Sequence, residues 1–458
     1  MNSPNLRRAA GLLLAGSLTL TAAAACSQGG DRGDQDGRGA ANGKVTVVVN
    51  GQPPQTQAFE RKVFDEDVAE FEAANPDIDI EPREGFMDPQ TFSAKLAGGQ
   101  LEDVYYAYFT DPANLIARRQ AADITEYVKD VPHYGEIRQE LRDVFSAGGK
   151  VYGIPTANYS MGLVYNRELF TRAGLDPDQP PRTWDDVRAA AKKIADLPGN
   201  EVGFAEYSRD NQGGWHFTAW VYSVGGRIAR QEGGKWVADF NDANGREVLD
   251  HLKAMRWTDN SMGEKQLLVI EDVQQMMGAG QLGMYLAAPD NIPTLVNQFD
   301  GDYADYGLAP IPEAEGTLIG GEGYMVNPKA SPEKIRAGLK WISWKYLDPD
   351  RMGKSLQRYK DQGQPIGLPV PPAADIWTGD VAAEQDRLKK SLATVPVANF
   401  QSYVDTKPEG RVEPPNAQQV YAVLDNVMQA VLTEPDADAD RLLADAEAKV
   451  NNVLAQVK

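Results

Sequence analysis

The stretch Gly149–Ile194, GKVYGIPTANYSMGLVYNRELFTRAGLDPDQPPRTWDDVRAAAKKI, carries the strongest fold signal in this chain of 458 residues. It ends in a helix signature, because Thr183 is a good N-cap: its hydroxyl can accept a hydrogen bond from the first turn. Apolar residues then recur at helical spacing and predict one buried helix face. The residues of this face are Trp184, Val187, Ala191 and Ile194.

The chain before this stretch alternates between predicted strands and helices. KVTVVVNG, residues 44–51, is a short β-branched run that predicts a buried strand. A helix ended by Asn75-Pro76 follows, and then IDIEPREG and DVYYAYFTD predict two more strands. This alternation predicts an α/β lobe with parallel strands, whose ligands sit at the carboxyl ends of the strands. The residues expected on that rim are Asn50, Gln52, Asp88, Tyr108 and Asp111; the alternative for any one of them is a solvated loop residue.

The pattern YGIP…GLVYNRELFTRAGL…PPRTWDDV closely resembles the sugar-type extracellular solute-binding proteins of ABC importers, the group that contains maltose-binding protein. Three further segments resemble the family in the same order: GQLEDVYYAYFTD, QMMGAGQLGMYLAAPDN and YGLAPIPEAEGTLIGGEGYMVNPKASPEK. In the family, the opening stretch marks the first crossover between two α/β lobes. The last segment approaches the second crossover and its glycine turn, and there Ser331-Pro332 is a good helix start.

The resemblance covers essentially residues 44–458 and implies an α/β, two-lobed periplasmic-binding-protein fold of type II, with a hinge between the lobes. It implies an N-terminal lobe made of residues 44–156 and 320–375. The C-terminal lobe would then consist of residues 157–319 and 376–458.

The resemblance also implies a sugar site in the cleft between the lobes. Aromatic rings would stack on sugar faces, and carboxylates and amides would bond the hydroxyls, each bond contributing about 0.5–1.5 kcal/mol. The segment RDNQGGWHFTAW combines polar and aromatic side chains with a Gly-Gly pair, which is unusual in a plain helix. Asp290 and Glu322 are expected to follow strand ends at the hinge. Beyond the rim, the implied ligand-binding residues are Asn158, Tyr159, Gln212, Trp215, Asp290, Glu322 and Arg411.

Some of these residues have plain alternatives. Arg411 is about as well explained by a surface ion pair with Glu409 or Glu413. Trp220 is expected in the core, and Tyr285 is expected to pack inward. Before Asp290 the family often has a tryptophan, whereas this chain reads Ala-Ala-Pro, so one stacking platform is replaced or missing.

The N-terminal residues predict export. Arg7 and Arg8 precede an uncharged apolar run that is too short to span a bilayer, as in a signal peptide over residues 1–25. Cys26, the only cysteine, follows a run of alanines that ends in Ala23-Ala24-Ala25 and resembles the lipidated cysteine of a bacterial lipobox, although Ala23 stands where a lipobox usually has leucine or another branched aliphatic residue. A plain secretory signal is the competing interpretation. Residues 26–43 are rich in glycine and charge, which predicts a flexible tether.

Composition and motifs argue against several other classes. The formal net charge of −20 disfavours nucleic-acid binding. Three scattered histidines show no metal-binding spacing, and no hydrolase elbow or P-loop occurs, so we expect no cofactor, no metal and no catalytic residue. Asp436–Glu447 partly matches a calcium loop, but Arg441 occupies the glycine position, and the apolar spacing favours an amphipathic helix instead.

The sequence thus predicts a monomeric lipoprotein outside the cytoplasm, held to the cell membrane only through Cys26. It would capture a di- or oligosaccharide by hinge closure and pass it to the transmembrane subunits of an ABC permease. A secreted glycosidase and a binding protein for a polyol or glycerophosphodiester are the alternatives.

Overall fold

β-Branched residues build the core of the first sheet. In the computed structural model, which describes residues 43–86, 89–370 and 375–457, strand β1 (Val45–Gln52) pairs in parallel with β2 (Ile78–Glu84) and β3 (Val104–Tyr108). Val47, Val49 and Val104 are completely buried. The three predicted strands and their parallel order are therefore confirmed.

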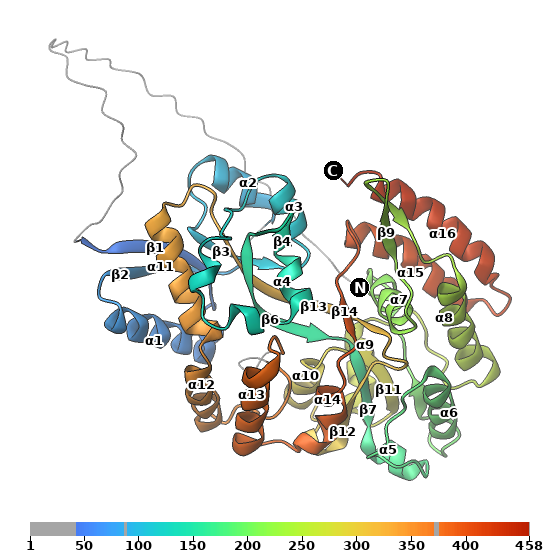
Figure 1. Ribbon diagram of the computed structural model, residues 1–458. Helices are drawn as coiled ribbons and strands as arrows, with labels where there is room; N and C mark the ends of the chain where they lie inside the picture. The colour runs from blue at the N-terminus through green and yellow to red at the C-terminus, as the bar shows by residue number, and fades with distance from the viewer. Residues whose placement is uncertain (1–42, 87–88, 371–374, 458) are drawn as a thin grey trace, which may run out of the picture. The chain divides into compact units, whose positions relative to one another are not determined.

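The chain contains two main sheets, and it passes from one to the other within a few residues. The first has the order β14-β13-β3-β1-β2, with β6 antiparallel to β13, and the second has the order β12-β7-β11-β8. Strand β6 ends at Ser160 in the first sheet and β7 begins at Gly162 in the second (Figure 1). The stretch that carries the strongest sequence signal thus contains the first crossover between sheets.

Strands, α-helices and short turns alternate along the whole described chain. The remaining strands are β4 (Ser146–Ala147), β5 (Lys150–Val151), β6 (Gly153–Ser160), β7 (Gly162–Asn166), β8 (Val202–Phe204), β9 (Ala229–Glu232), β10 (Lys235–Ala238), β11 (Leu282–Ala287), β12 (Tyr306–Pro310), β13 (Gly316–Val326) and β14 (Glu409–Arg411). The α-helices are α1 (Ala58–Ala74), α2 (Pro89–Ala97), α3 (Pro112–Ala117), α4 (Gln139–Val144), α5 (Arg167–Arg172), α6 (Trp184–Ala195), α7 (Gln212–Ser223), α8 (Ala243–Lys253), α9 (Ile270–Gly278), α10 (Asn291–Gln298), α11 (Pro332–Ile342), α12 (Pro349–Asp361), α13 (Gly379–Leu392), α14 (Gln401–Asp405), α15 (Ala417–Thr433) and α16 (Ala439–Leu454). Short 3₁₀ or π turns are η2 (Val128–Asp130), η3 (Tyr134–Glu136), η4 (Ala254–Thr258), η5 (Tyr303–Asp305), η6 (Ser343–Leu347) and η7 (Val397–Phe400).

The buried side chains form separate cores for the two sheets. One cluster joins the first sheet to α1, α11 and the start of α13, and two others cover the second sheet with α6–α10 and α14–α16. Ile376 and Trp377 belong to the cluster of the first sheet, whereas Leu368 and Val395 belong to a cluster that covers the second sheet. The expected lobe boundaries remain a prediction, but the C-terminal third of the chain contributes to both cores.

Helix starts follow the sequence signals. Thr183 and Asp186 form a capping box at α6, and Ser331 caps α11 with Pro332 in its first turn. The predicted buried face of α6 and the buried position of Trp220 are confirmed. The predicted amphipathic helix near the C-terminus is also present as α16, where the Asp438 side chain accepts a hydrogen bond from the backbone of Arg441.

The segment with the Gly-Gly pair, whose composition is unusual for a helix, forms helix α7 from Gln212 onward. Packing rather than turn formation explains the glycines. A Cβ on Gly214 would lie 2.4 Å from the Cα of Tyr421, and a Cβ on Gly213 would lie 2.7 Å from the Cα of Ser208. The two glycines therefore let α7 approach neighbouring backbone closely, including that of α15.

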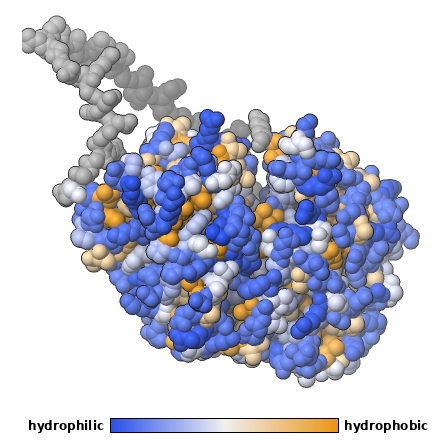
Figure 2. All heavy atoms as spheres, viewed as in Figure 1, coloured by the Kyte–Doolittle hydropathy of each residue, from blue (hydrophilic) through white to orange (hydrophobic). Residues whose placement is uncertain are grey.

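Among the described residues, no helix combines the length and apolarity required to cross a membrane. Hydrophilic residues predominate on the face drawn in Figure 2, and hydrophobic ones occur there in small scattered groups.

A buried carboxylate joins α1 to the segment after α11. Asp67 is 6% exposed and accepts hydrogen bonds from Lys345 at 2.6 Å, Arg351 at 2.9 Å and Arg358 at 3.0 Å. Burial lowers the pKa of Lys345, and the charge of Asp67 opposes that effect. Arg351 and Arg358 also pair with Glu70, whereas the described ion pairs give Lys345 no carboxylate other than Asp67. Removing Asp67 therefore leaves the buried charge of Lys345 without compensation.

We expect Asp67→Ala to lower the free energy of unfolding by about 3–5 kcal/mol, the usual cost of breaking a buried ion pair. Urea denaturation of the purified protein measures this. The matched control is Glu66→Ala, because Glu66 is half exposed and lies 3.9 Å from Arg358, and we expect a change below about 0.5 kcal/mol. Equal effects of the two substitutions would contradict the assigned role of Asp67.

Candidate functional site

A hollow of about 220 Å³ lies where the first sheet meets the segment that follows β14. Its wall combines aromatic rings, carboxylates and a glycine-rich part of β13. Three residues of the predicted site, Tyr108, Tyr159 and Glu322, line it together. The other lining residues are Phe109, Thr110, Ile319, Gly320, Gly321 and Glu413.

Aromatic side chains around this hollow are unusually exposed. Among the described residues, five large hydrophobic side chains are exposed, and three of them are Phe86 at 49%, Tyr108 at 44% and Tyr159 at 37%. Tyr106 links the first two, with ring centroids 4.5 Å from Phe86 and 4.9 Å from Tyr108. Exposed rings held by neighbouring rings are suited to contact a ligand, because they lose little conformational entropy on binding.

The carboxylates of the site are held by tyrosine hydroxyls. Tyr106 donates a hydrogen bond to Glu322 at 2.7 Å, and Tyr421 donates one to Glu413 at 2.9 Å. Burial raises the pKa of both carboxyl groups, and the hydrogen bonds lower it by less. Each carboxylate keeps acceptor capacity for a further donor, because an ionised carboxylate offers about four lone-pair sites.

The charges of three acidic residues from distant parts of the chain act on Tyr159. Burial raises the pKa of its hydroxyl, and the charges of Glu413, Asp290 and Glu322 raise it further. Burial also raises the pKa of Asp290, although that side chain is exposed to solvent. A side chain that is both solvent-exposed and crowded by protein atoms is typical of the wall of a cleft.

Three of the predicted ligand-binding residues have hydrogen-bond partners within the protein. The side-chain oxygen of Asn50 accepts a hydrogen bond from the backbone of Tyr106 at 2.6 Å, and Gln52 donates one to Asp65 at 2.7 Å. Both Asn50 and Gln52 are buried. Gln212 accepts a hydrogen bond from the backbone of Ile270 at 2.7 Å. Asn50 and Gln52 lie within β1 rather than after it, and Gln212 begins α7. A ligand role for the three residues stays a prediction.

Four further predicted residues also contact other parts of the protein. Asn158 is buried in β6 and donates to the carbonyl of Asp375 at 3.1 Å, while half-buried Trp215 packs against both clusters of the second sheet. Arg411 forms the expected ion pair with Glu409 and also bonds the carbonyls of Gly225 and Gly226. Asp111 lies at the start of α3 and accepts from the backbone of Tyr108 at 3.0 Å. Asp88 and Cys26 lie outside the described residues.

The position of Glu322 is a correction. It was expected after a strand end, at a glycine turn, but GGEGY lies inside the long strand β13. The glycines serve close packing instead, because a Cβ on Gly320 would lie 2.2 Å from the hydroxyl of Tyr159. Asp290, by contrast, does follow β11, and Tyr285 is fully buried as expected.

Glu413 is the site residue that the sequence did not reveal as a ligand candidate. It was considered only as an ion-pair partner for Arg411, whereas the structure turns Arg411 toward Glu409. The signal available was the sequence VEPP, in which prolines after an acidic residue predict an extended segment that presents it.

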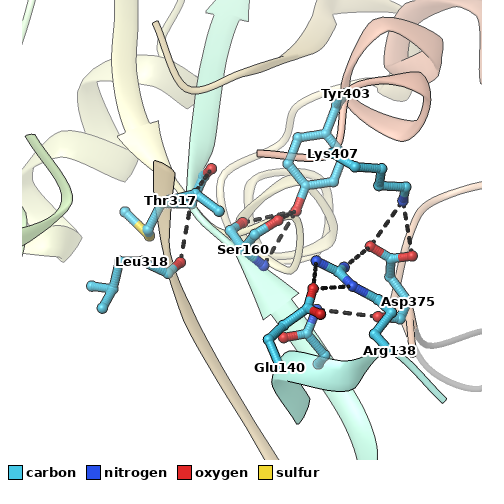
Figure 3. A network of polar contacts seen from close by, with 10 residues as sticks. Arg138, Glu140, Ser160, Thr317, Leu318, Asp375, Tyr403 and Lys407 are labelled. Carbon is cyan, nitrogen blue, oxygen red and sulfur yellow. Dashed lines mark hydrogen bonds and ion pairs between the residues drawn. The ribbon is translucent and has the colours of Figure 1, made fainter. Parts of the chain in front are cut away.

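A polar network ties down the crossover beside the site (Figure 3). The Tyr403 hydroxyl lies 2.6 Å from the Ser160 hydroxyl and donates to the Ser160 carbonyl at 2.8 Å. On the next strand, the Thr317 hydroxyl donates to the carbonyl of Met161 at 3.0 Å. These contacts hold the short connection between β6 and β7, where the chain changes sheets.

The same network includes a charged cluster. Arg138, which is 7% exposed, bonds Asp375 at 2.9 Å, and Lys407 bonds the same carboxylate at 2.9 Å (Figure 3). Asp375 thereby joins the loop before α4 to the segment before β14. The described residues contain no group of three or more histidine, cysteine, aspartate or glutamate side chains arranged to hold a metal ion.

Comparison with known proteins identifies the class. Residues 52–348 match the family model described as bacterial extracellular solute-binding protein. A putative binding protein of Brucella abortus (strain 2308) is 25% identical over 437 residues, which cover 90% of this chain and 93% of that protein.

Solved structures agree in fold. The cyclic α-maltosyl-1,6-maltose binding protein of Arthrobacter globiformis superposes with a TM-score of 0.70 at 22% identity, covering 91% of this chain and 100% of that one. UgpB of Mycobacterium tuberculosis, solved with glycerophosphocholine, superposes with a TM-score of 0.66 at 16% identity, covering 90% and 99%.

The chain therefore belongs to the bacterial extracellular solute-binding protein family. It has the two-lobed periplasmic-binding fold that the sequence predicted. Members of this class bind a solute and deliver it to an ABC permease, and the class is one of binding proteins rather than enzymes.

Asp111 gives the protein a predictable pH dependence. Burial raises its pKa from the usual 3.8 to about 6. Between these values the folded state binds more protons than the unfolded state, so stability falls as the pH rises from about 4 to 6. Asp111→Asn removes the charge and keeps an acceptor for the Tyr108 backbone, so we expect it to raise the free energy of unfolding at pH 7 by on the order of 1–3 kcal/mol.

Urea denaturation at pH 4 and pH 7 measures this effect. The gain from Asp111→Asn should be present at pH 7 and nearly absent at pH 4. A gain of the same size at both pH values would contradict the raised pKa of Asp111.

Proposed function

We propose that this protein captures a sugar, of di- or oligosaccharide size, in the hollow beside β13. The observation that carries the proposal is the meeting of exposed Tyr108 and Tyr159 with the carboxylates of Glu322 and Glu413 in one hollow. Flat aromatic faces suit the apolar faces of sugar rings, and carboxylates accept hydrogen bonds from hydroxyl groups.

Hinge closure would then couple binding to delivery. Tyr108 and Glu322 belong to the first sheet, whereas Glu413 is held by Tyr421 of α15, which packs on the second sheet. A solute that contacts both groups stabilises the closed arrangement over the open one, and the permease would recognise that form. No bond of the solute is made or broken in this scheme.

The described lining of the hollow argues against an anionic solute. It contains Glu322 and Glu413 but no lysine or arginine among the described residues. A phosphate group would meet negative charge there rather than a basic partner. The glycosidase alternative is also less supported, because the family consists of solute-binding proteins.

A thermal-shift screen with mono-, di- and oligosaccharides and polyols tests the proposal. A ligand present at a hundred times its dissociation constant should add about 2.7 kcal/mol to stability. We expect Tyr159→Ala to weaken binding of the best ligand by at least about tenfold, because a stacking platform is lost. Tyr134→Ala, which removes a half-buried ring outside the lining of the hollow, is the control.

Analysis of the sugar after incubation separates the alternatives. Recovery of the intact sugar supports capture, whereas cleaved products would indicate a glycosidase. A stabilising polyol without any sugar response would contradict the proposed solute class.

We also propose that Cys26 is lipidated and anchors the protein outside the cytoplasm. Arg7 and Arg8, the apolar run and the small residues before Cys26 support this. In cells that express the full chain, we expect Cys26→Ser to abolish incorporation of labelled fatty acid and to shift the protein from the membrane fraction. The lipid anchor would be contradicted if the wild-type protein carried no lipid and Cys26→Ser left the membrane association unchanged.

A further inference from the structure

Among the described residues, no lysine or arginine lines the hollow that Glu322 and Glu413 share. Burial raises the pKa of Asp290, Glu322 and Glu413, and no lysine or arginine contributes to any of these three shifts. Desolvated carboxylates without a countercharge are costly to ionise, so a site of this kind gains most from a ligand that brings positive charge.

Two sets of cations close to these carboxylates have partners of their own within the described residues. Arg411, two residues before Glu413, bonds Glu409 and the carbonyls of Gly225 and Gly226. Glu322 also borders a second hollow of about 160 Å³ that Lys345 and Arg351 help to line, but both of these cations bind Asp67. Neither of these two sets of cations leaves a free positive charge for the carboxylates of Asp290, Glu322 and Glu413.

The aromatic residues of the site suit a cation as well. Tyr108 and Tyr159 line the same hollow as Glu322 and Glu413, and both rings are exposed. The face of a tyrosine ring attracts a cation through its quadrupole, by about 0.5–1 kcal/mol at exposed sites and about 2 kcal/mol or more when the cation is desolvated. A site that combines aromatic rings with carboxylates therefore favours binding of a cationic group over binding of a neutral hydroxyl.

We propose that the solute captured in this hollow carries a positively charged nitrogen, which lies against Tyr159 and between Glu322 and Glu413. The nitrogen is either the protonated amino group of an amino sugar or a quaternary ammonium group, since both offer positive charge to rings and carboxylates. This inference rests on the proposed capture of a solute in the hollow and specifies the chemistry of that solute. A response of the choline pair without any sugar response would support the positive charge and contradict the proposed sugar.

Matched ligand pairs that differ in the charge of one group test the inference. One pair consists of cellobiose and the β-1,4-linked disaccharide of glucosamine. In the glucosamine disaccharide, ammonium groups replace hydroxyls of cellobiose. The other pair is choline and its uncharged isostere 3,3-dimethylbutan-1-ol. Isothermal titration of the purified protein at pH 6.5 and low salt measures each affinity, and the pair that responds identifies the source of the nitrogen.

We expect the charged member of one pair to bind at least tenfold more tightly than its neutral partner. Glu322→Gln and Glu413→Gln should each reduce that preference at least fivefold, because each removes one negative charge and keeps the shape of the side chain. Glu66→Gln, on the exposed face of α1, should leave it unchanged. If one of the two cleft variants fails to fold, the other carries the same test.

Two outcomes would overturn the inference, and they are distinguishable. Equal or tighter binding of cellobiose, or of another neutral sugar from the screen, would refute the cationic group while supporting sugar capture. Absence of binding by both pairs and by the whole sugar panel would refute the inference together with the proposed function.

Discussion

The pairing of β13 with its neighbours is the constraint on which the site depends. This eleven-residue strand pairs with β3, β6 and β14, so it brings together chain segments that lie far apart in sequence. Its register places Glu322 opposite Tyr108 and Gly320 opposite Tyr159. Because Gly320 has no side chain, the hydroxyl of Tyr159 can lie directly over the strand backbone.

The electrostatics of the cleft follow from the same arrangement. Glu322 of β13 and Glu413 after β14 line the same hollow as Tyr159, and the charge of Asp290 before α10 also acts on this tyrosine. Burial raises the pKa of each carboxyl group, while tyrosine hydroxyls supply hydrogen bonds to Glu322 and Glu413. On α1, by contrast, buried charge is compensated within the chain, since Asp67 binds three cations. In the hollow, by contrast, no lysine or arginine is among the described lining residues.

The family relationship and the site contribute different information. Membership establishes a solute-binding protein with two lobes, but proteins of this fold differ in what they bind. They include a binding protein for cyclic α-maltosyl-1,6-maltose and a protein solved with glycerophosphocholine. The choice of solute therefore depends on the side chains in this particular cleft. Those side chains are aromatic and acidic, and they restrict the chemical class of the solute more than the fold does.

The sequence by itself determined the local structure and the fold class. Strands β1–β3, the caps of α6 and α11 and the helix α16 follow from periodicity and capping, because these signals act within a few residues. The family pattern in Gly149–Ile194 also indicated the crossover between lobes. Only the tertiary structure decided which side chains meet. Asn50 bonds the backbone of Tyr106, Gln52 bonds Asp65, and Glu413 lines the same hollow as Glu322, because hydrogen bonds and strand pairing between distant segments leave no periodic signal in the sequence.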